Sequence, residues 1–189
     1  MRPVLETPRL ILRPFAEEDA DAVFAVYSDR ETNTFLPWFP AGTKEEAARL
    51  CARHAEESFS YAICPRGGTP VGYVHLGKAA PYDLGYALLP AFRGRGLATE
   101  ACAAVMAQAR ADGLQYLTAT HDVNNPASGR VMRRLGMTYR YSYEELWQPK
   151  GVPVTFRLYQ IDFTDGVPEY DGYRKTVCLT RLRALREAL

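Results

Sequence analysis

The chain has 189 residues and a mass of 21.2 kDa, which is typical of one domain with a modest appendage and excludes two large domains. Hydrophobic residues make up 47% of it and charged residues 24%, so it is neither disordered nor fibrous and has enough apolar surface for a core. The formal net charge of +1 gives no reason to expect a nucleic acid or an anionic membrane as partner.

The first fifteen residues contain four charged side chains, so they lack the apolar run of a secretory signal. No apolar stretch approaches the length of a membrane span. We therefore expect a soluble, cytoplasmic protein with no membrane contact. The four cysteines are widely spaced and form no zinc-ligand pattern with histidine, which predicts reduced, structural thiols and no metal site.

Short apolar runs and helical periodicities alternate through the first half of the chain. Thr43 followed by Glu46 is typical of a helix N-cap with its capping box. The aromatic loop at 35–40 either fills the core or walls a substrate pocket. The expected elements are a strand at 9–13, helices at 17–28 and 43–57, a hairpin of strands at 59–64 and 71–76 around a Pro- and Gly-rich turn, and a strand at 83–89.

The second half of the chain opens with its clearest helix. Leu97, Ala101 and Val105 recur at fourfold spacing, and Glu100 in the first turn is explained by the helix dipole alone. The expected elements are this helix at 97–112, a strand at 116–121, a helix at 126–135, a hairpin of strands at 139–147 and 152–163, and an amphipathic helix at 178–189.

The predicted elements divide the chain into one domain and a tail. We expect the domain to span residues 1–164 and the tail to span residues 165–189. The amphipathic helix of the tail packs either on its own domain or on a second copy of the chain, which would make a homodimer.

Charge is distributed unevenly along the sequence. Residues 1–92 carry a net charge of −3, and residues 93–140 carry a net charge of +4. This division leads to the hypothesis that an anionic ligand binds the middle of the chain and that the first half handles a cationic one. The alternative is that these charges only form solvated helix faces.

The segment 83–98 is the most informative in the sequence. A strand leads through Arg93-Gly94-Arg95-Gly96 into the N-terminus of the long helix. Such a turn gathers unpaired backbone N–H groups, its glycines let the backbone approach a ligand, and its arginines add positive charge, which together favour phosphate binding. The spacing fits neither the G-x-x-x-x-G-K-[ST] loop nor the dinucleotide G-x-G-x-x-G motif, which disfavours NTPases and dinucleotide oxidoreductases.

Two motifs follow one another in the second half of the chain. Arg93, Gly96 and Ala98 fit the pattern R-x-x-G-x-[GA], and Asn125 and Ser128 open the pattern N-x-x-[SA], which ends in Gly-Met. At this separation both patterns resemble the GNAT superfamily of acetyl-CoA-dependent N-acetyltransferases. In that family the first binds the pyrophosphate of the cofactor and the second lies along its pantetheine arm.

The start of the chain adds a third match. The segment 7–13, Thr-Pro-Arg-Leu-Ile-Leu-Arg, followed by Glu-Asp-Ala at 18–20, is similar to the RimJ/RimL branch of that superfamily. Members of this branch acetylate protein N-termini, and some act on small amines. Together the matches span roughly residues 7–163 and leave the tail outside the resemblance.

The resemblance implies an α/β fold of the α+β type, with a mixed, mostly antiparallel twisted sheet of about seven strands and helices on both faces. The strands at 83–89 and 116–121 would lie parallel and splay apart, so that acetyl-CoA enters between them. One backbone N–H would face the thioester oxygen as an oxyanion hole. The residues expected to bind the cofactor are Leu88, Leu89, Arg93, Gly94, Arg95, Gly96, Leu97, Ala98, Asn125 and Ser128.

Acetyl transfer to an amine needs a neutral nucleophile, a polarised carbonyl and a proton for the departing thiolate. His121 is the first candidate for the base, because it ends a splayed strand and titrates in the useful range; the alternative is a structural histidine. Many GNAT members have a tyrosine acid where this chain has Met132, and the RimJ/RimL resemblance gives that role to Ser128. Asp83 lies five residues before Leu88 and, at about 3.3 Å per residue, is expected to be too distant.

The sequence therefore predicts an acetyl-CoA:amine N-acetyltransferase that works by direct transfer in a ternary complex without a metal. The acceptor is either a peptide N-terminus or a small amine. A catalytically silent acyl-CoA-binding module is the alternative from another class. Docking of RNA on the basic block at 93–140 is disfavoured, because that block lacks interleaved exposed aromatic residues.

Overall fold

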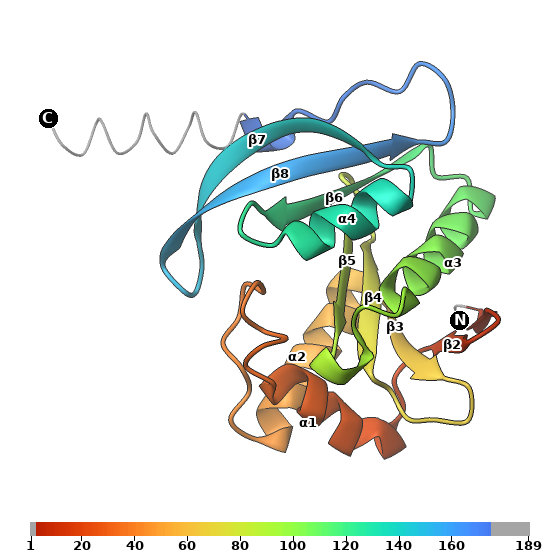
Figure 1. The fold of residues 1–189 in the computed structure, drawn as a ribbon, viewed down its shortest axis with the longest axis vertical. Helices are drawn as coiled ribbons and strands as arrows, with labels where there is room; N and C mark the ends of the chain where they lie inside the picture. The colour runs from red at the N-terminus through yellow and green to blue at the C-terminus, as the bar shows by residue number, and fades with distance from the viewer. Residues whose placement is uncertain (1–2, 175–189) are drawn as a thin grey trace, which may run out of the picture.

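The computed structural model describes residues 3–174 (Figure 1). One antiparallel sheet has the strand order β1-β2-β3-β4-β5, and a second has the order β6-β8-β7. The strands are β1 (Leu5–Glu6), β2 (Leu10–Arg13), β3 (Ser58–Pro65), β4 (Gly72–Gly77), β5 (Leu84–Leu88), β6 (Tyr116–Asp122), β7 (Thr138–Trp147) and β8 (Val152–Asp162). The helices are α1 (Ala20–Ser28), α2 (Lys44–Glu57), α3 (Leu97–Ala111) and α4 (Pro126–Arg134), with 3-10 turns η1 (Glu17–Asp19) and η2 (Pro90–Phe92).

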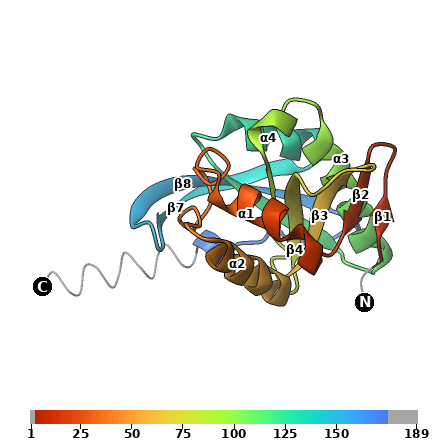
Figure 2. The same ribbon diagram turned by 90° about the horizontal axis from the view of Figure 1, so that it is seen from below.

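Helices cover both faces of the five-stranded sheet (Figures 1 and 2). On one face, α3 packs its apolar stripe, including Ala101 and Val105, against Leu76 and other buried side chains. On the other face, α1 and α2 pack against Tyr73 and Ala87. Successive residues of a strand point to opposite faces, so β4 and β5 each contribute to both cores. Removal of these apolar surfaces from water stabilises the three layers.

The two sheets meet where β5 and β6 begin. Among the described residues, these strands are joined by one parallel bridge between Asp83 and Thr118, and the Thr118 N–H lies 3.4 Å from the Tyr82 carbonyl oxygen. Beyond the bridge, β5 pairs with β4 while β6 pairs with β8. The prediction of a splayed parallel pair is therefore confirmed, and the mixed sheet is divided in two at this point. We call the diverging pair β5 and β6, beyond this bridge, the wedge.

Backbone groups of β5 alternate between β4 and the wedge. The Leu89 N–H donates to the Val71 carbonyl at 2.9 Å, and the Gly77 N–H donates to the Asp83 carbonyl at 3.0 Å. In an antiparallel pair, every second residue bonds to the same neighbour, so the odd-numbered residues of β5 face β4. The N–H groups of Tyr86 and Leu88 therefore point toward β6.

The predicted elements agree with the structure to within a few residues, with small additions. The segment predicted as a helix over 17–28 starts as the 3-10 turn η1, and the two-residue strand β1 was not predicted. No helix in residues 3–174 is long and apolar enough to cross a bilayer.

The first part of the tail packs on the second sheet. The Tyr173 ring stacks on Tyr143 with ring centroids 4.7 Å apart, and the Arg174 guanidinium lies 4.0 Å from the centroid of the Tyr141 ring. Residues 165–174 thus add to the core of β7 and β8. The amphipathic helix expected at 178–189 lies outside the described residues.

Candidate active site

The loop between β5 and α3 has the geometry of an anion site. Gly94 and Gly96 have φ values of +73° and +78°, a region that residues with a Cβ rarely adopt. Gly96 is the N-cap of α3 and no side chain caps the helix, so the first N–H groups of its 15 residues have neither an intrahelical partner nor a cap. Free amides and the helix dipole at one point suit the diphosphate of acetyl-CoA.

The Arg93 side chain does not point into this loop. Its Nε donates to the Leu88 carbonyl at 2.9 Å, Nη2 donates to Thr32 Oγ1 at 3.0 Å, and Nη1 pairs with Glu31 Oε1 at 2.6 Å. The guanidinium thus joins the end of β5 to the connection between α1 and α2. Of the two amides expected at the cofactor, the Leu88 N–H faces the wedge, whereas the Leu89 N–H is bonded to β4.

The N-terminus of α4 lies across the wedge from β5. Asn125 caps it, with Oδ1 accepting from the Ser128 N–H at 3.3 Å, and Pro126 occupies the first helical position. The Ser128 hydroxyl lies 2.9 Å from the Tyr86 hydroxyl, which also donates to the Ser128 carbonyl at 3.0 Å. Met132, at the position of the usual tyrosine acid, is 1% exposed in the core.

Tyr86 was not singled out from the sequence. Its spacing with Leu84 and Leu88 places it on the face of β5 that packs toward α3 and α4. This alternation along the strand is the one feature of the sequence that could have indicated Tyr86 as a site residue. No pattern in the sequence states which residue of α4 it meets. The structure thus adds a second hydroxyl beside Ser128.

His121 is buried between β6 and α4. Its Nδ1 lies 2.7 Å from the Asp122 carbonyl, which can only accept, so Nδ1 carries the proton and Nε2 has a free lone pair. Nε2 is buried without a partner and lies 2.6 Å from the position that a Cβ on Gly129 would occupy. Burial lowers the pKa of His121 below 6.5, so the ring is neutral at pH 7.

Asp83 lies at the bridge that closes the wedge, on the opposite face of the sheets from His121. It shares a face of β5 with Ala87, which packs toward α1 and α2. Thr118 Oγ1 donates to its Oδ1 at 3.2 Å, and burial raises the pKa of its carboxyl from 3.8 to about 7. Asp83 is five residues from Leu88 along the strand, as expected from the sequence, but only three residues from Tyr86. The Tyr86 N–H also faces the wedge.

The aromatic loop adds Trp38 to the core, as one of the two expectations had it, and it also lines a surface hollow. Trp38 is 8% exposed, its Nε1 donates to Asn33 Oδ1 at 2.9 Å, and its ring centroid lies 4.3 Å from that of His54. Phe39 is 59% exposed. Both line a hollow of about 880 Å³ between this loop, α2 and the turn that joins β7 to β8. In that turn, Lys150 Nζ donates to the Asn33 carbonyl at 2.8 Å, so the loop and the turn are held together.

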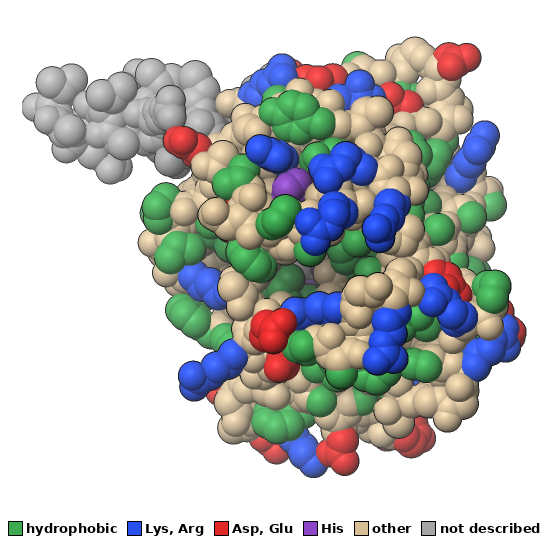
Figure 3. Space-filling view, viewed as in Figure 1, with side chains coloured by type: hydrophobic (Ala, Val, Ile, Leu, Met, Phe, Trp, Pro, Cys, Tyr) green, Lys and Arg blue, Asp and Glu red, His purple; other side chains and the backbone are tan. Residues whose placement is uncertain are grey.

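Positive side chains gather on the surface around the wedge (Figure 3). Arg130, Arg133 and Arg134 are exposed on α4, and Arg93 and Arg95 are exposed on the loop before α3. This arrangement agrees with the hypothesis that the basic block meets an anionic ligand. Among residues 3–174, no group of three His, Cys, Asp or Glu side chains is arranged to hold a metal ion.

Known proteins share this sequence and fold. Residues 9–138 match the sequence profile of the family described as acetyltransferase (GNAT) domain. The N-acetyltransferase YoaA of Bacillus subtilis (strain 168) is 27% identical over 173 residues, which cover 85% of this chain and 97% of that protein. The L-methionine sulfoximine/L-methionine sulfone acetyltransferase of Pseudomonas aeruginosa PAO1 is 25% identical over 169 residues, covering 83% of this chain and 98% of that protein.

A solved structure with a related fold is the Salmonella typhimurium acetyltransferase that modifies the N-terminal serine of 50S ribosomal subunit protein L7/L12. It superposes with a TM-score of 0.75 at 18% identity and covers 86% of this chain and 100% of that chain. The predicted fold is thus confirmed. Because the family profile matches more than half of the sequence, the chain belongs to the GNAT family of acetyl-CoA-dependent acetyltransferases.

Proposed function

We propose that this protein transfers the acetyl group of acetyl-CoA to a primary amine by direct attack in a ternary complex. One observation carries the proposal: the wedge is lined by a β5 backbone amide that is free of β4, at Leu88, and by the hydroxyl groups of Tyr86 and Ser128, which lie 2.9 Å from each other. A backbone N–H directed at a thioester oxygen stabilises the charge that develops there. A hydroxyl beside the sulfur supplies the proton that the thiolate needs.

The expected cofactor contacts divide into backbone and side-chain roles. The loop from Arg93 to Ala98 would hold the diphosphate through its amides and through the Arg95 charge. The Leu88 N–H would face the thioester oxygen, and Asn125 would hold the start of α4 in place beside the pantetheine arm. In the reaction, the amine nitrogen bonds to the carbonyl carbon as the C–S bond breaks, and Ser128 donates its proton to sulfur. The proton lost by the nitrogen passes to a base, and Ser128 regains a proton from solvent, so that the net transfer is from nitrogen to sulfur.

Two buried groups are candidates to accept the proton of the amine, one on each face of the wedge. His121 is neutral and presents the free lone pair of Nε2 toward α4. Asp83 lies on the face that also carries the aromatic loop, with a pKa of about 7 for its carboxyl; because it stands five residues from Leu88, it would reach the amine only through a chain of several water molecules. Either group is partly or wholly unprotonated at neutral pH, as a base must be.

We infer that the acceptor is a small amine rather than the N-terminus of a protein. The contact of Lys150 with the Asn33 carbonyl holds the β7–β8 turn beside the aromatic loop, and the hollow between them, about 880 Å³, lies within the size range of small-molecule sites. The Pseudomonas relative is named for two small amino-acid substrates, whereas the Salmonella structure is named for a protein N-terminus. The identity to the former is 25%, against 18% to the latter, which also favours a small acceptor.

The test is turnover of acetyl-CoA with a panel of small amines, amino acids and short peptides, followed by release of free thiol. Acceptor-dependent release with the small amines is expected, together with acetylated product by mass spectrometry. Binding of acetyl-CoA without turnover for any acceptor would support the silent acyl-CoA-binding module instead. A thermal-shift screen measures binding separately, since a ligand at 100 times its Kd stabilises by about 2.7 kcal/mol.

A further inference from the structure

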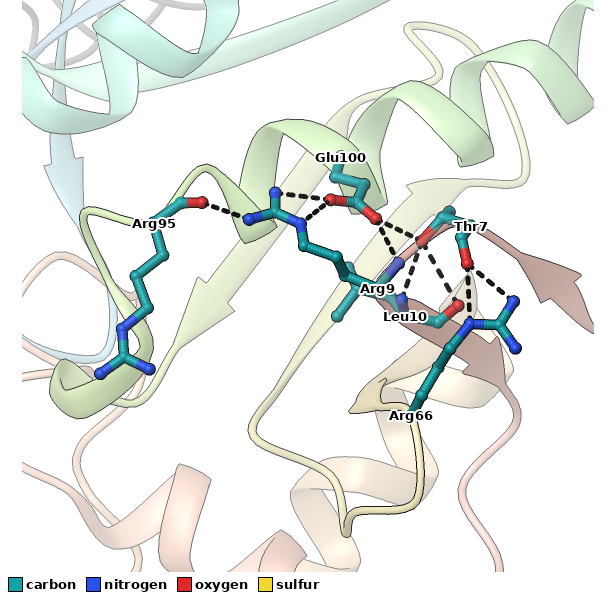
Figure 4. Close-up of polar contacts among 6 residues, drawn as sticks. All are labelled: Thr7, Arg9, Leu10, Arg66, Arg95 and Glu100. Carbon is teal, nitrogen blue, oxygen red and sulfur yellow. Dashed lines mark hydrogen bonds and ion pairs between the residues drawn. The ribbon is translucent and has the colours of Figure 1, made fainter.

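The N-terminal segment is joined to the first turn of α3 through Glu100 (Figure 4). Thr7 Oγ1 donates to Glu100 Oε1 at 2.6 Å, and the Arg9 N–H donates to the same oxygen at 3.0 Å. The Arg9 guanidinium contacts Oε2 through Nε at 2.6 Å and through Nη2 at 2.5 Å. Both carboxylate oxygens of Glu100 therefore have hydrogen-bond donors. The sequence predicted only a favourable interaction of Glu100 with the helix dipole, and the structure adds these contacts.

The Arg9 guanidinium also reaches the loop before α3 (Figure 4). Its Nη1 donates to the Arg95 carbonyl at 2.8 Å, and its Nη2 lies 3.5 Å from the position that a Cβ on Gly96 would take. In a trans peptide, the carbonyl and the N–H of the next residue point in opposite directions. Because Arg9 holds the Arg95 carbonyl on its own side, the Gly96 N–H points away from Arg9.

Arg9 also removes a charge conflict at this end of α3. The amides and dipole of a helix N-terminus favour an anion, but a carboxylate in the same turn repels one. Burial would raise the pKa of Glu100, yet the hydrogen bonds from Thr7 and Arg9 outweigh it and hold this pKa below its usual value. Glu100 is therefore ionised, and the Arg9 cation neutralises it.

We propose that Arg9 is a positioning residue for acetyl-CoA, which presets the Gly96 amide and the N-terminus of α3 for the diphosphate while it neutralises Glu100. This inference rests on the proposed function, which assigns the diphosphate to residues 93–98. The inference assigns a role to the Thr-Pro-Arg-Leu segment at 7–10, to which the proposed function alone assigns none. Arg9 acts through the loop and through Glu100 and need not touch the reacting atoms.

The experiment compares two ligands in the full-length protein. Coenzyme A carries the diphosphate, and pantetheine lacks it. The Arg9→Ala variant is expected to bind coenzyme A about tenfold more weakly by calorimetry, as for the loss of one charged hydrogen-bond network, with kcat at saturation changed less than twofold. The inhibition constant of pantetheine is expected to stay within twofold of the wild-type value.

Arg66→Ala is the matched control. Arg66 donates to the Thr7 carbonyl through Nε at 3.1 Å and Nη2 at 2.8 Å, so it anchors the same segment. Among the described residues, Arg66 forms hydrogen bonds with Glu6, Thr7 and Arg9 and not with α3 or the loop before it. This variant is expected to retain the coenzyme A affinity of the wild type. Arg9→Lys keeps the charge but has one nitrogen where the guanidinium uses three, so it cannot reproduce the paired bonds to Glu100 together with the bond to the Arg95 carbonyl, and an intermediate affinity is expected.

The outcomes separate this inference from the proposed function. If the wild type binds neither acetyl-CoA nor coenzyme A, the proposed function fails. If the wild type binds and Arg9→Ala binds equally well, the role of Arg9 is refuted while the function stands. Two results would show that Arg9 only holds the segment in place. One is an equal loss of affinity for coenzyme A and for pantetheine in Arg9→Ala. The other is an equal loss of coenzyme A affinity in Arg9→Ala and Arg66→Ala. Urea unfolding of each variant checks that the chains are folded in the assay.

Discussion

The Ser128 and Tyr86 hydroxyl groups lie 42 residues apart in the sequence and 2.9 Å apart in space. Burial raises the pKa of Tyr86 above its usual value, so its hydroxyl keeps its proton at neutral pH. The Tyr86 hydroxyl also donates to the Ser128 carbonyl, which fixes the pair at the start of α4. A proton donor is thus available at the wedge although Met132 replaces the usual tyrosine.

Ser128→Ala is expected to lower kcat by about 100-fold, the lower end of what a positioned proton donor contributes, and to leave the KM for acetyl-CoA within about threefold. Tyr86→Phe is expected to lower kcat by a smaller factor, because the Ser128 hydroxyl remains. Steady-state kinetics measure both. The control is Tyr139→Phe, which removes a similar pair with Ser142, at 3.0 Å, on the exposed surface of β7. A kcat for Ser128→Ala equal to that of this control would exclude Ser128 as the acid.

The pH dependence of kcat/KM separates the two candidate bases. A base must be unprotonated, so activity rises with pH through its pKa. If Asp83 accepts the proton, the rise of kcat/KM with pH is centred near pH 7 and is lost in Asp83→Asn. If His121 accepts it, the rise is centred below pH 6.5 and is lost in His121→Gln, because burial lowers that pKa. A rise unchanged in both variants would exclude both residues.

The Asp83 carboxyl also makes stability depend on pH. Its pKa is raised from 3.8 to about 7 in the folded protein, so the folded state keeps a proton that the unfolded chain releases between these values. The free energy of unfolding therefore falls as pH rises through this window, by up to about 4 kcal/mol. Relative to wild type, Asp83→Asn is expected to be more stable at pH 8 than at pH 5 in urea titrations. A pH-independent difference would contradict the raised pKa.

At the scale of elements, the turn from β5 into α3 combines a left-handed backbone conformation, which glycine adopts without strain, with open space. Gly94 has a φ of +73° and no atom within 4 Å of a Cβ placed on it. Gly67, in the turn between β3 and β4, has the same φ and the same open surroundings. The two glycines therefore impose the same conformational requirement, and they differ in their distance from the proposed diphosphate site.

Gly94→Ala and Gly67→Ala are each expected to cost about 1 kcal/mol of stability, because both force a side chain into the left-handed region. Gly94→Ala alone is expected to weaken coenzyme A binding, by about fivefold or more, since the Cβ intrudes where the backbone meets the diphosphate. Thermal unfolding and calorimetry give the two quantities. Equal Kd values for the two variants would place the diphosphate elsewhere.

On the scale of the whole molecule, the division of the sheet creates the site. The Asp83–Thr118 bridge joins two sheets that each complete their own pairing away from the wedge. Alternate backbone N–H groups of β5 therefore bond to β4, and the others point toward β6. A ligand that lies between β5 and β6 can accept hydrogen bonds from the N–H groups that point toward β6.

Acetyl-CoA is expected to slow amide hydrogen exchange at Tyr86 and Leu88 by about tenfold or more and to change Ala87 much less, because Ala87 already faces β4. Residue-resolved exchange measured by NMR tests this difference. Equal protection of all three amides would indicate that the ligand stabilises β5 as a whole without entering the wedge.

Local sequence patterns were sufficient to predict the elements, the family resemblance and the loop before α3, because periodicity, caps and glycine turns are local properties. They also located Asn125 and Ser128, since these residues belong to one helix. The tertiary structure decided that Tyr86 meets Ser128, that Arg9 holds Glu100 and that the Arg93 side chain turns to the α1–α2 connection. These contacts join residues from different elements, and only the packing of the sheets and helices sets the distances between them.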